Sequence, residues 1–263
     1  IKCAETAANF FSVFPAPVHI YENASIVEAA KLFMNIYRDV NIALVNELAL
    51  ICEKTGVDVV KAINAANVEK KTHLLTPGLV GGYCLPKDTY HLVYSAKRVG
   101  YEPQLITLAR ILNDQMPYHV LKLIVEAYKE MKVPLQNSRI ALLGLGFKAN
   151  SGDMREAPSI EIVKELLSRK AKLIAHDPFV QLDELEQILP GLTCTRDVEE
   201  AIDGATCIVI VTDHLEYRKL TAKFLQKKMT TPCAIVDARH IIDSAEAKIS
   251  NVVFRGLGKP NRS

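Results

Sequence analysis

The sequence predicts an α/β protein with two parts of different architecture. Residues 25–133 carry the periodicity of helices, whereas residues 134–263 alternate short β-rich runs with helical segments. Such alternation is typical of a parallel sheet with helices on both faces. A chain of 263 residues, nearly half of them hydrophobic, is long enough to bury two ordinary cores.

The longest predicted element is a helix over residues 26–55. Apolar residues recur through this segment at helical spacing, and it contains neither Gly nor Pro. Asn23 or Ser25 would cap its start, and Gly56 would end it. A helix of about 30 residues spans roughly 45 Å. That length is typical of the spine of a dimer, so we expect a homodimer through this helix.

Other helices are expected on both sides of it. Residues 1–14 present Ala and Phe on one face, and the proline-rich PAPVHIYEN that follows predicts a turn and a short strand. After the long helix, helical patterns occupy GVDVVKAINAAN, DTYHLVYSAKRVG and residues 103–131. The segment THLLTPGLVGGYCLPKD, between the first two of these, has the Gly and Pro content of a loop.

Five β-rich runs follow at intervals that suit a parallel sheet. They are RIALLGLGF (139–147), AKLIAHD (171–177), CIVIVT (207–212), AIVDAR (234–239) and VVFRGLG (252–258). Helical patterns such as SIEIVKELLSRK separate them. The change of pattern falls near VPLQNS, which predicts a domain boundary at residues 133–138.

Composition excludes several classes of function. With 32 basic and 30 acidic residues, the net charge of +2 does not favour nucleic acid or a membrane surface as a partner. The chain has no apolar run of about 18 residues and no signal-peptide pattern. Six cysteines without a CxxC pair, and no histidine pair at metal-finger spacing, predict a reducing cytoplasm and no metal site. The chain begins without Met and in mid-pattern, so we expect it to be part of a longer protein.

One cysteine differs from the others in its surroundings. Cys84 lies in GGYCLPKD, after a glycine pair and three residues before Lys87. Glycines allow close backbone approach to a ligand, and a nearby lysine favours the thiolate, which is the nucleophilic form. A lone cysteine is more often inert. Cys207 and Cys233, however, lie in apolar strand-like runs typical of core cysteines, and Cys84 does not.

A second motif, GLGFKA at residues 144–149, follows the first predicted strand. Its G-x-G-x-x-A spacing matches a dinucleotide fingerprint, and Asp177, at the end of the second predicted strand, is placed as a ribose-binding acid. Against this, Lys148 lies inside the motif, and the polar loop GFKANSGDMREAPS delays the next helix. The motif therefore leaves open a dinucleotide, another nucleoside diphosphate and a simple strand-to-helix turn.

In the long predicted helix, Lys31 and Asn35 are four residues apart and share one face. A solvated polar stripe is the simplest interpretation. Lys31, however, follows two alanines and precedes Leu-Phe-Met, and a lysine in an apolar stretch requires a partner or has a chemical role.

Four of these segments resemble motifs of one known family. KLFMNIYRDVNIALVNEL, GGYCLPKD, GFKANSGDMREAPS and VDAR are similar, in order and approximate spacing, to motifs of the UDP-glucose/GDP-mannose dehydrogenases. The resemblance covers essentially the whole chain. It implies a remnant of an NAD-binding domain (1–24), a central helical dimerisation domain (25–133) and a Rossmann-like UDP-binding domain (134–263). It also implies that an N-terminal NAD-binding Rossmann domain would precede residue 1.

The resemblance implies a reaction. Such enzymes oxidise the C6 alcohol of a UDP-sugar to a carboxylate with two NAD⁺ and a water, through an aldehyde, a cysteine thiohemiacetal and a thioester. RDVNIALVNEL is most similar to the branch that oxidises UDP-N-acetylmannosamine, with UDP-glucose and UDP-N-acetylglucosamine as alternatives. This chain alone is then expected to bind the UDP-sugar without turnover. The other hypotheses are a non-catalytic dimeric nucleotide-sugar binder and an ordinary NAD domain at residues 134–263.

The resemblance also implies roles for individual residues. Cys84 matches the nucleophile, Lys31 the cation that stabilises the developing oxyanion, Asn35 its companion, and Asp88 the acid that assists hydrolysis. Substrate contacts are implied for Lys31, Asn35, Leu75, Thr76, Pro77, Gly78, Leu79, Val80, Gly81, Phe147, Lys148 and Arg239. The backbone amides of residues 75–81 would wrap the sugar diphosphate. NAD contacts are implied for Cys84, Lys87 and Arg155.

The chain departs from the family pattern ahead of the glycine loop. Members usually carry there an arginine that reaches the substrate of a neighbouring subunit, whereas this chain reads NVEKKTHLLTPG. Lys71 and His73 are the candidate replacements. The stretch PGLVGGYC also has one glycine fewer than many relatives.

Overall fold

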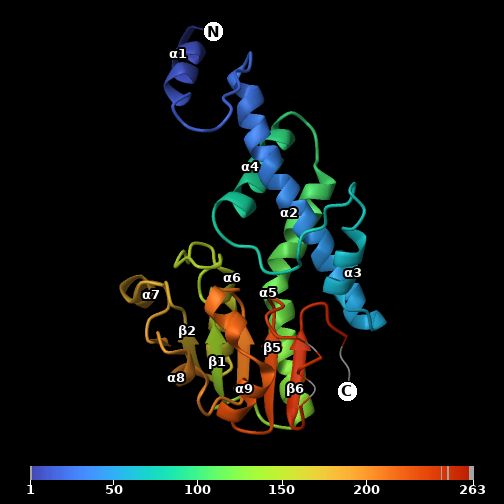
Figure 1. The fold of residues 1–263 in the computed structure, drawn as a ribbon, viewed down its shortest axis with the longest axis vertical. Coiled ribbons are helices and arrows are strands. Elements are labelled where there is room, and N and C mark those ends of the chain that lie inside the picture. The colour runs from blue at the N-terminus through green and yellow to red at the C-terminus, as the bar shows by residue number, and fades with distance from the viewer. Residues whose placement is uncertain (1, 244, 248, 261–263) are drawn as a thin grey trace.

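The computed structural model describes residues 2–243, 245–247 and 249–260, and it has the predicted two-part α/β architecture (Figure 1). The first part is helical. Its helices are α1 (Lys2–Phe11), α2 (Ala24–Thr55), α3 (Val59–Ala66), α4 (Cys84–Arg98) and α5 (Gln104–Met131). The second part is a sheet with flanking helices, and α5 runs from one part into the other (Figure 1).

The sheet has six parallel strands in the order β3-β2-β1-β4-β5-β6. The strands are β1 (Arg139–Leu143), β2 (Lys172–His176), β3 (Thr193–Thr195), β4 (Cys207–Ile210), β5 (Cys233–Asp237) and β6 (Val252–Gly256). Five of them overlap the predicted β-rich runs, and β5 begins one residue before its run; the three-residue β3 carries no such pattern. The order is that of a doubly wound sheet, which binds its ligands beyond the strand carboxyl ends, where the order reverses between β1 and β4.

Helices cover both faces of this sheet. They are α6 (Pro158–Ser168), α7 (Leu182–Ile188), α8 (Val198–Ile202) and α9 (Ala222–Lys228), with the 3-10 helix η1 (Leu215–Lys219). Successive residues of β1 alternate between the faces, as strand geometry requires. Ile140 and Leu142 join the core that contains α5 and α6, whereas Ala141 and Leu143 join the core that contains α8 and α9. Both faces of the sheet are therefore occupied by apolar packing, and the loops at the strand ends are where polar groups can reach a ligand.

α2 begins and ends where its sequence predicts. The Asn23 side chain accepts a hydrogen bond from the Ser25 amide at 2.7 Å, and Gly56 ends the helix at φ +79°, which glycine adopts without strain. The cap at Asn23 and the stop at Gly56 are therefore confirmed. The short strand expected in PAPVHIYEN is wrong. The sheet includes no strand from residues 15–23, because this exposed segment lies beside the helical part, away from any strand that could pair with it (Figure 1).

α5 belongs to both parts of the molecule. In the helical part it packs against α2 and α4, and in the sheet part it packs against α6, β5 and β6. Ile124, Ala127 and Tyr128 near its end lie in the same buried cluster as Ile140 and Leu142 of β1. Neither α5 nor any other helix in the described residues is long and apolar enough to cross a bilayer.

Candidate active site

Lys31, Asn35 and Asp88 meet where α2 and α4 pack together. The Asp88 carboxylate lies 3.6 Å from the Lys31 ammonium and accepts a hydrogen bond from the Asn35 amide at 2.5 Å. Lys31 and Asn35 share a face of α2, and Cys84, the first residue of α4, lies one turn before Asp88. Three of the four residues matched to catalytic roles are therefore in contact across two packed helices, and Cys84 lies one turn from Asp88 on the same face of α4.

This surface is open to solvent. Cys84 is exposed, and the side chains of Lys31 and Asp88 are 60% and 21% exposed, while Asn35 is buried. The thiol stands at the N-terminus of α4, where unpaired backbone N–H groups and the helix dipole favour negative charge. A sulfur nucleophile, an ammonium and a carboxylate together suit attack on a carbonyl carbon and hydrolysis of the resulting ester.

Tyr83 brings together the two cations matched to cofactor contacts. The Lys87 ammonium lies 3.7 Å from the centre of the Tyr83 ring, and the guanidinium carbon of Arg155 lies 5.0 Å from it; both are cation–π distances. Asp153 pairs with Arg155 at 2.6 Å and raises the pKa of the guanidinium. Sequence reasoning missed Tyr83, although an aromatic residue directly before the cysteine was a usable signal.

The glycine loop 75–81 contacts the sheet part at two residues matched to substrate binding. A Cβ on Gly78 would lie 2.7 Å from Arg239 Nη1, and a Cβ on Gly81 would lie 2.6 Å from Phe147 Cβ. Phe147 follows β1 and Arg239 follows β5, so the fold assembles three distant segments at one place. Glycine is required at Gly81, where a Cβ would also lie 2.8 Å from the Glu156 backbone carbonyl, whereas at Gly78 it would meet only the flexible end of the Arg239 side chain.

Two backbone amides of this loop are engaged within the protein. The Leu75 amide donates to Asn41 Oδ1 at 2.9 Å, and the Gly78 amide donates to Asn46 Oδ1 at 2.8 Å. The expectation that the loop amides wrap a diphosphate is therefore wrong for these two groups, because their hydrogens already have acceptors on α2. Of the other loop residues, Thr76 is exposed, Val80 is half-buried, and Pro77, Leu79 and Gly81 are buried.

A buried carboxylate holds the loop between β1 and α6. Asp177, 1% exposed, accepts hydrogen bonds from the amides of Leu145 and Gly146 at 2.7 and 3.0 Å and pairs with His214 Nε2 at 3.1 Å. Burial would raise the pKa of Asp177, but these hydrogen bonds outweigh burial and lower it to about 2. The expectation of a ribose-binding acid here is wrong, because the carboxylate oxygens are already used. α6 begins only at Pro158, which confirms the delayed helix.

Charged groups lie on the loops that follow three strands, β1, β4 and β5, at the carboxyl edge of the sheet. Lys148 is exposed on the loop after β1. After β5, Arg239 Nε and Nη2 lie 3.2 and 2.5 Å from Oδ1 of Asp213, which follows β4. Burial would raise the pKa of Asp213, but Arg239 outweighs it and lowers that pKa. This is the strand-order reversal, where doubly wound sheets bind nucleotides.

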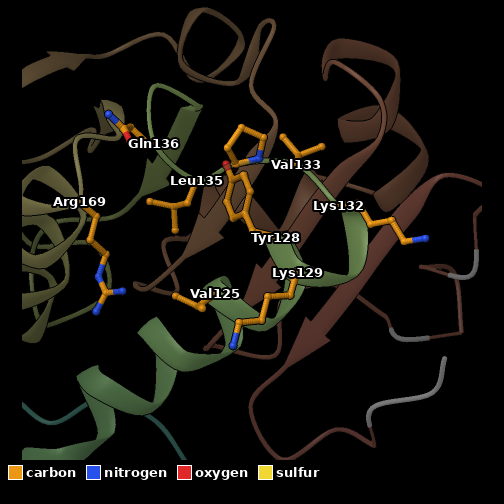
Figure 2. A pocket seen from close by; sticks show the side chains of 9 residues that line it. Val125, Tyr128, Lys129, Lys132, Val133, Leu135, Gln136 and Arg169 are labelled. Atoms are coloured by element: carbon orange, nitrogen blue, oxygen red, sulfur yellow. The ribbon is translucent and has the colours of Figure 1, made fainter.

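A separate hollow, shown in Figure 2, lies at the amino ends of the strands. It is lined by Val125, Tyr128, Lys129, Lys132, Val133, Pro134, Leu135, Gln136 and Arg169. The charged ends of Lys129, Lys132 and Arg169 point in different directions (Figure 2). They do not converge on one anion, and this hollow is distinct from the surface that carries Cys84.

Family models match both parts of the chain. Residues 25–115 match the central domain of the UDP-glucose/GDP-mannose dehydrogenase family, and residues 141–244 match the UDP-binding domain of the same family. The chain is 34% identical over 260 residues to a UDP-N-acetyl-D-mannosamine dehydrogenase of Pyrococcus horikoshii, covering 98% of this chain and 58% of the relative. It is 30% identical to a UDP-N-acetyl-D-glucosamine 6-dehydrogenase of Pseudomonas aeruginosa, covering 90% of this chain and 56% of the relative.

Solved structures agree with these matches. A UDP-D-ManNAc dehydrogenase from Pyrococcus horikoshii superposes with a TM-score of 0.86 at 32% identity, covering 99% of this chain and 58% of that chain. An NDP-N-acetyl-D-galactosaminuronic acid dehydrogenase from Methanosarcina mazei superposes with a TM-score of 0.83 at 32% identity, covering 91% of this chain and 52% of that chain. The chain thus spans little more than half the length of these relatives. Sequence and fold agree over both parts, and the chain belongs to the UDP-glucose/GDP-mannose dehydrogenase family, of which it contains the central and UDP-binding domains.

Proposed function

We propose that this chain supplies the substrate site and the catalytic thiol of an NAD-dependent enzyme that oxidises the C6 alcohol of a UDP-sugar to the carboxylate. The observation that carries the proposal is the meeting of Lys31, Asn35 and Asp88, one helical turn from the exposed Cys84. The relatives described above carry names that specify N-acetylated sugars. Two of them, which cover 98% and 99% of this chain, are named for UDP-N-acetyl-D-mannosamine, and this sugar is the favoured substrate.

Cys84 attacks the aldehyde carbon once C6 has lost its first electron pair. A carbon–sulfur bond forms, and the carbonyl oxygen takes the negative charge. A serine could not replace the thiol, because its alkoxide is not available near neutral pH. The Lys31 ammonium, 60% exposed on the adjoining helix, stabilises the charged oxygen.

The adduct is a thiohemiacetal, and loss of a second electron pair from C6 converts it to a thioester. Asp88 acts in the hydrolysis of this thioester, which frees the thiol. Its carboxylate takes a proton from the water that attacks the thioester, and the carbon–sulfur bond then breaks to release carboxylate and Cys84. Hydrogen bonding from Asn35 and the nearby Lys31 ammonium orient the Asp88 oxygens. Lys31 thus serves both the addition and the hydrolysis, whereas Asn35 and Asp88 serve the hydrolysis.

NAD fits the surface beside Cys84. Two exposed cations, Lys87 and Arg155, lie over the Tyr83 ring, and this combination suits a ligand with a diphosphate and planar rings. NAD⁺, when bound, supplies the electron acceptor for each oxidation. Lys87, Arg155 and Cys84 are the residues of this chain that would contact it.

The UDP-sugar binds between the glycine loop and the carboxyl edge of the sheet. Phe147 and Arg239 pack against Gly81 and Gly78 of this loop, so both parts of the chain are close enough to contact one ligand. Lys148 faces solvent on the adjacent loop and offers its charge to a phosphate. This assignment gives GLGFKA to the UDP half of the substrate rather than to NAD.

A homodimer forms through α2. Phe33, Tyr37, Leu44 and Ile51 are large, exposed and spaced by four and seven residues, which places them on one stripe of the helix. Spacing by seven is the repeat with which two helices pack over a long contact. Lys71 and His73 are exposed ahead of the glycine loop, so their side chains are accessible to a neighbouring subunit.

Isothermal titration calorimetry with UDP tests the proposal. The folded chain is expected to bind UDP, and Lys148→Ala is expected to weaken binding about tenfold through loss of a charge-assisted contact. Lys132→Ala, which removes an equally charged residue from the hollow of Figure 2, is the control and leaves the affinity unchanged. A wild-type chain that is folded and binds no UDP contradicts the proposed function.

A further inference from the structure

Five polar side chains are buried together in the helical part, and the proposed chemistry uses none of them. Asp39, Asn46, Thr89, Arg110 and Asn113 are each at most 1% exposed. Burial of a charge among apolar helices is unfavourable unless the charge is paired and every polar group has a partner. Such a group therefore adds little stability of its own, and its value lies in the geometry that it fixes.

Asp39 is the acceptor at the centre of this group. Arg110 Nη1 and Asn113 Nδ2 donate to Asp39 Oδ1 at 2.6 and 2.8 Å, and the Thr89 hydroxyl donates to Oδ2 at 3.0 Å. Arg110 and Asn113 present N–H donors, which fits an ionised carboxylate, and the single hydrogen of the Thr89 hydroxyl is shared between Asp39 and the Leu85 carbonyl at 3.1 Å. Burial raises the pKa of Asp39, and Arg110 opposes that rise. One arm of the group thus ends at Thr89, the residue after Asp88 on α4.

The other arm ends on the glycine loop. The amide of Asn46 pairs with both backbone groups of Gly78: the Gly78 N–H donates to Oδ1 at 2.8 Å, and Nδ2 donates to the Gly78 carbonyl at 3.0 Å. Nδ2 also donates to Asn113 Oδ1 at 2.9 Å. The Gly78 amide fixes which way the Asn46 side chain faces, and Asn46 in turn fixes Asn113, whose nitrogen then faces Asp39. Each amide has one orientation that satisfies all its partners.

We infer that Asn46, Asn113 and Asp39 form a positioning network that holds Gly78 of the glycine loop in place relative to Thr89 on α4. The inference rests on the proposed function, in which the loop binds the UDP-sugar and α4 carries Cys84 and Asp88. Because Gly78 also packs against Arg239, the network sets the distance between the nucleotide end of the substrate and the thiol. None of its side chains contacts the reacting atoms.

Asn67 provides a matched control. Its amide pairs with both backbone groups of Leu74, just ahead of the same loop, at 2.8 Å in each direction. The chemistry equals that of Asn46 on Gly78, but Asn67 is exposed and has no contact with Asp39 or α4 among its described hydrogen bonds. Loss of Asn67 therefore frees the loop backbone without touching the network.

The test combines Asn46→Ala, Thr89→Val, their double variant and Asn67→Ala. UDP affinity is measured by calorimetry, and exchange at the Gly78 amide by hydrogen–deuterium exchange. Asn46→Ala is expected to weaken UDP binding about tenfold and to speed Gly78 exchange, since a buried polar pairing is lost. Thr89→Val, which keeps the shape of the side chain, is expected to weaken binding about threefold, but only while Asn46 is present. Asn67→Ala speeds exchange at Leu74 alone.

The network would be overturned if Thr89→Val and Asn46→Ala weakened UDP binding independently of each other. It would also be overturned if Asn67→Ala weakened UDP binding as much as Asn46→Ala does. Hydrogen–deuterium exchange distinguishes a failure of the network from a failure of the proposed function, because it requires no UDP. A wild-type chain that binds no UDP contradicts the proposed function. The network is then still tested by hydrogen–deuterium exchange: faster exchange at the Gly78 amide in Thr89→Val supports it, and unchanged exchange contradicts it. Should Asn46→Ala fail to fold, Asn46→Asp keeps the acceptor for the Gly78 amide, removes both donors and is expected to show the same uncoupling.

Discussion

Cys84 differs from the core cysteines because of where the chain places it. Burial raises the pKa of the Cys233 thiol to about 11 and raises that of Cys207 as well, so both remain protonated near neutral pH. Cys84 is exposed at the start of a helix, and the preceding Gly82 takes φ +83°, where a side chain would meet the Phe147 ring. Gly82, two residues before the cysteine, thus allows the backbone to lie close to the Phe147 ring, and Cys84 supplies the nucleophile.

Cys84→Ser tests this role in an active enzyme that contains the chain. The first oxidation should persist, and formation of the carboxylate should fall by roughly a thousandfold or more, because serine is a poor nucleophile without a base. Product analysis should then detect aldehyde. Cys3→Ser removes another exposed thiol, on α1, and should leave both steps unchanged. Normal carboxylate formation by Cys84→Ser excludes a thioester route.

At the scale of elements, the loop between β1 and α6 depends on one carboxylate. Asp177 holds the amides of Leu145 and Gly146 at the start of the loop, and its other oxygen accepts from the amides of Phe179 and Val180 after β2. The backbone directly before Phe147 and Lys148 is therefore held in place by hydrogen bonds to Asp177. Neutralising Asp177 weakens every one of these contacts.

The pKa of about 2 predicts how stability depends on pH. Because the folded-state pKa lies below the ordinary value of 3.8, Asp177 contributes fully above about pH 5, and the contribution is lost as pH falls toward 2. It amounts to about 2 kcal/mol. In urea unfolding between pH 6 and pH 2.5, Asp177→Asn should lose less stability than the wild type. Asp183→Asn, at an exposed carboxyl on α7, should follow the wild type; parallel curves for all three proteins would contradict the assignment.

The elements were predicted from the sequence more completely than the contacts between them. Helical spacing and a cap identified α2, and β-rich runs identified five strands, because these patterns are local. Resemblance supplied Lys31, Asn35, Cys84 and Asp88 as a set. The pairing of Asn46 with Gly78 and of Asp177 with its loop could not be predicted, because these contacts join residues about 30 positions apart that carry no shared pattern.

At the scale of the whole molecule, the unpartnered stripe on α2 predicts self-association. Leu44→Lys places a charge in the centre of the stripe, and the dimer expected in sedimentation velocity should shift to monomer, since burial of an unpaired charge is unfavourable. Leu167→Lys is the matched control, because this leucine is similarly exposed on α6. A wild-type chain that sediments as a monomer at all concentrations contradicts the dimer.

The path of α5 limits how the molecule can be divided. Cleavage in the connection at residues 132–138 would leave Ile124, Ala127 and Tyr128 on the first fragment, although these side chains complete the core under β1. The second fragment would then present an open trough along one face of its sheet. We therefore expect the two parts to unfold together as one cooperative unit, and we expect a hinge that admits ligand to lie outside this helix.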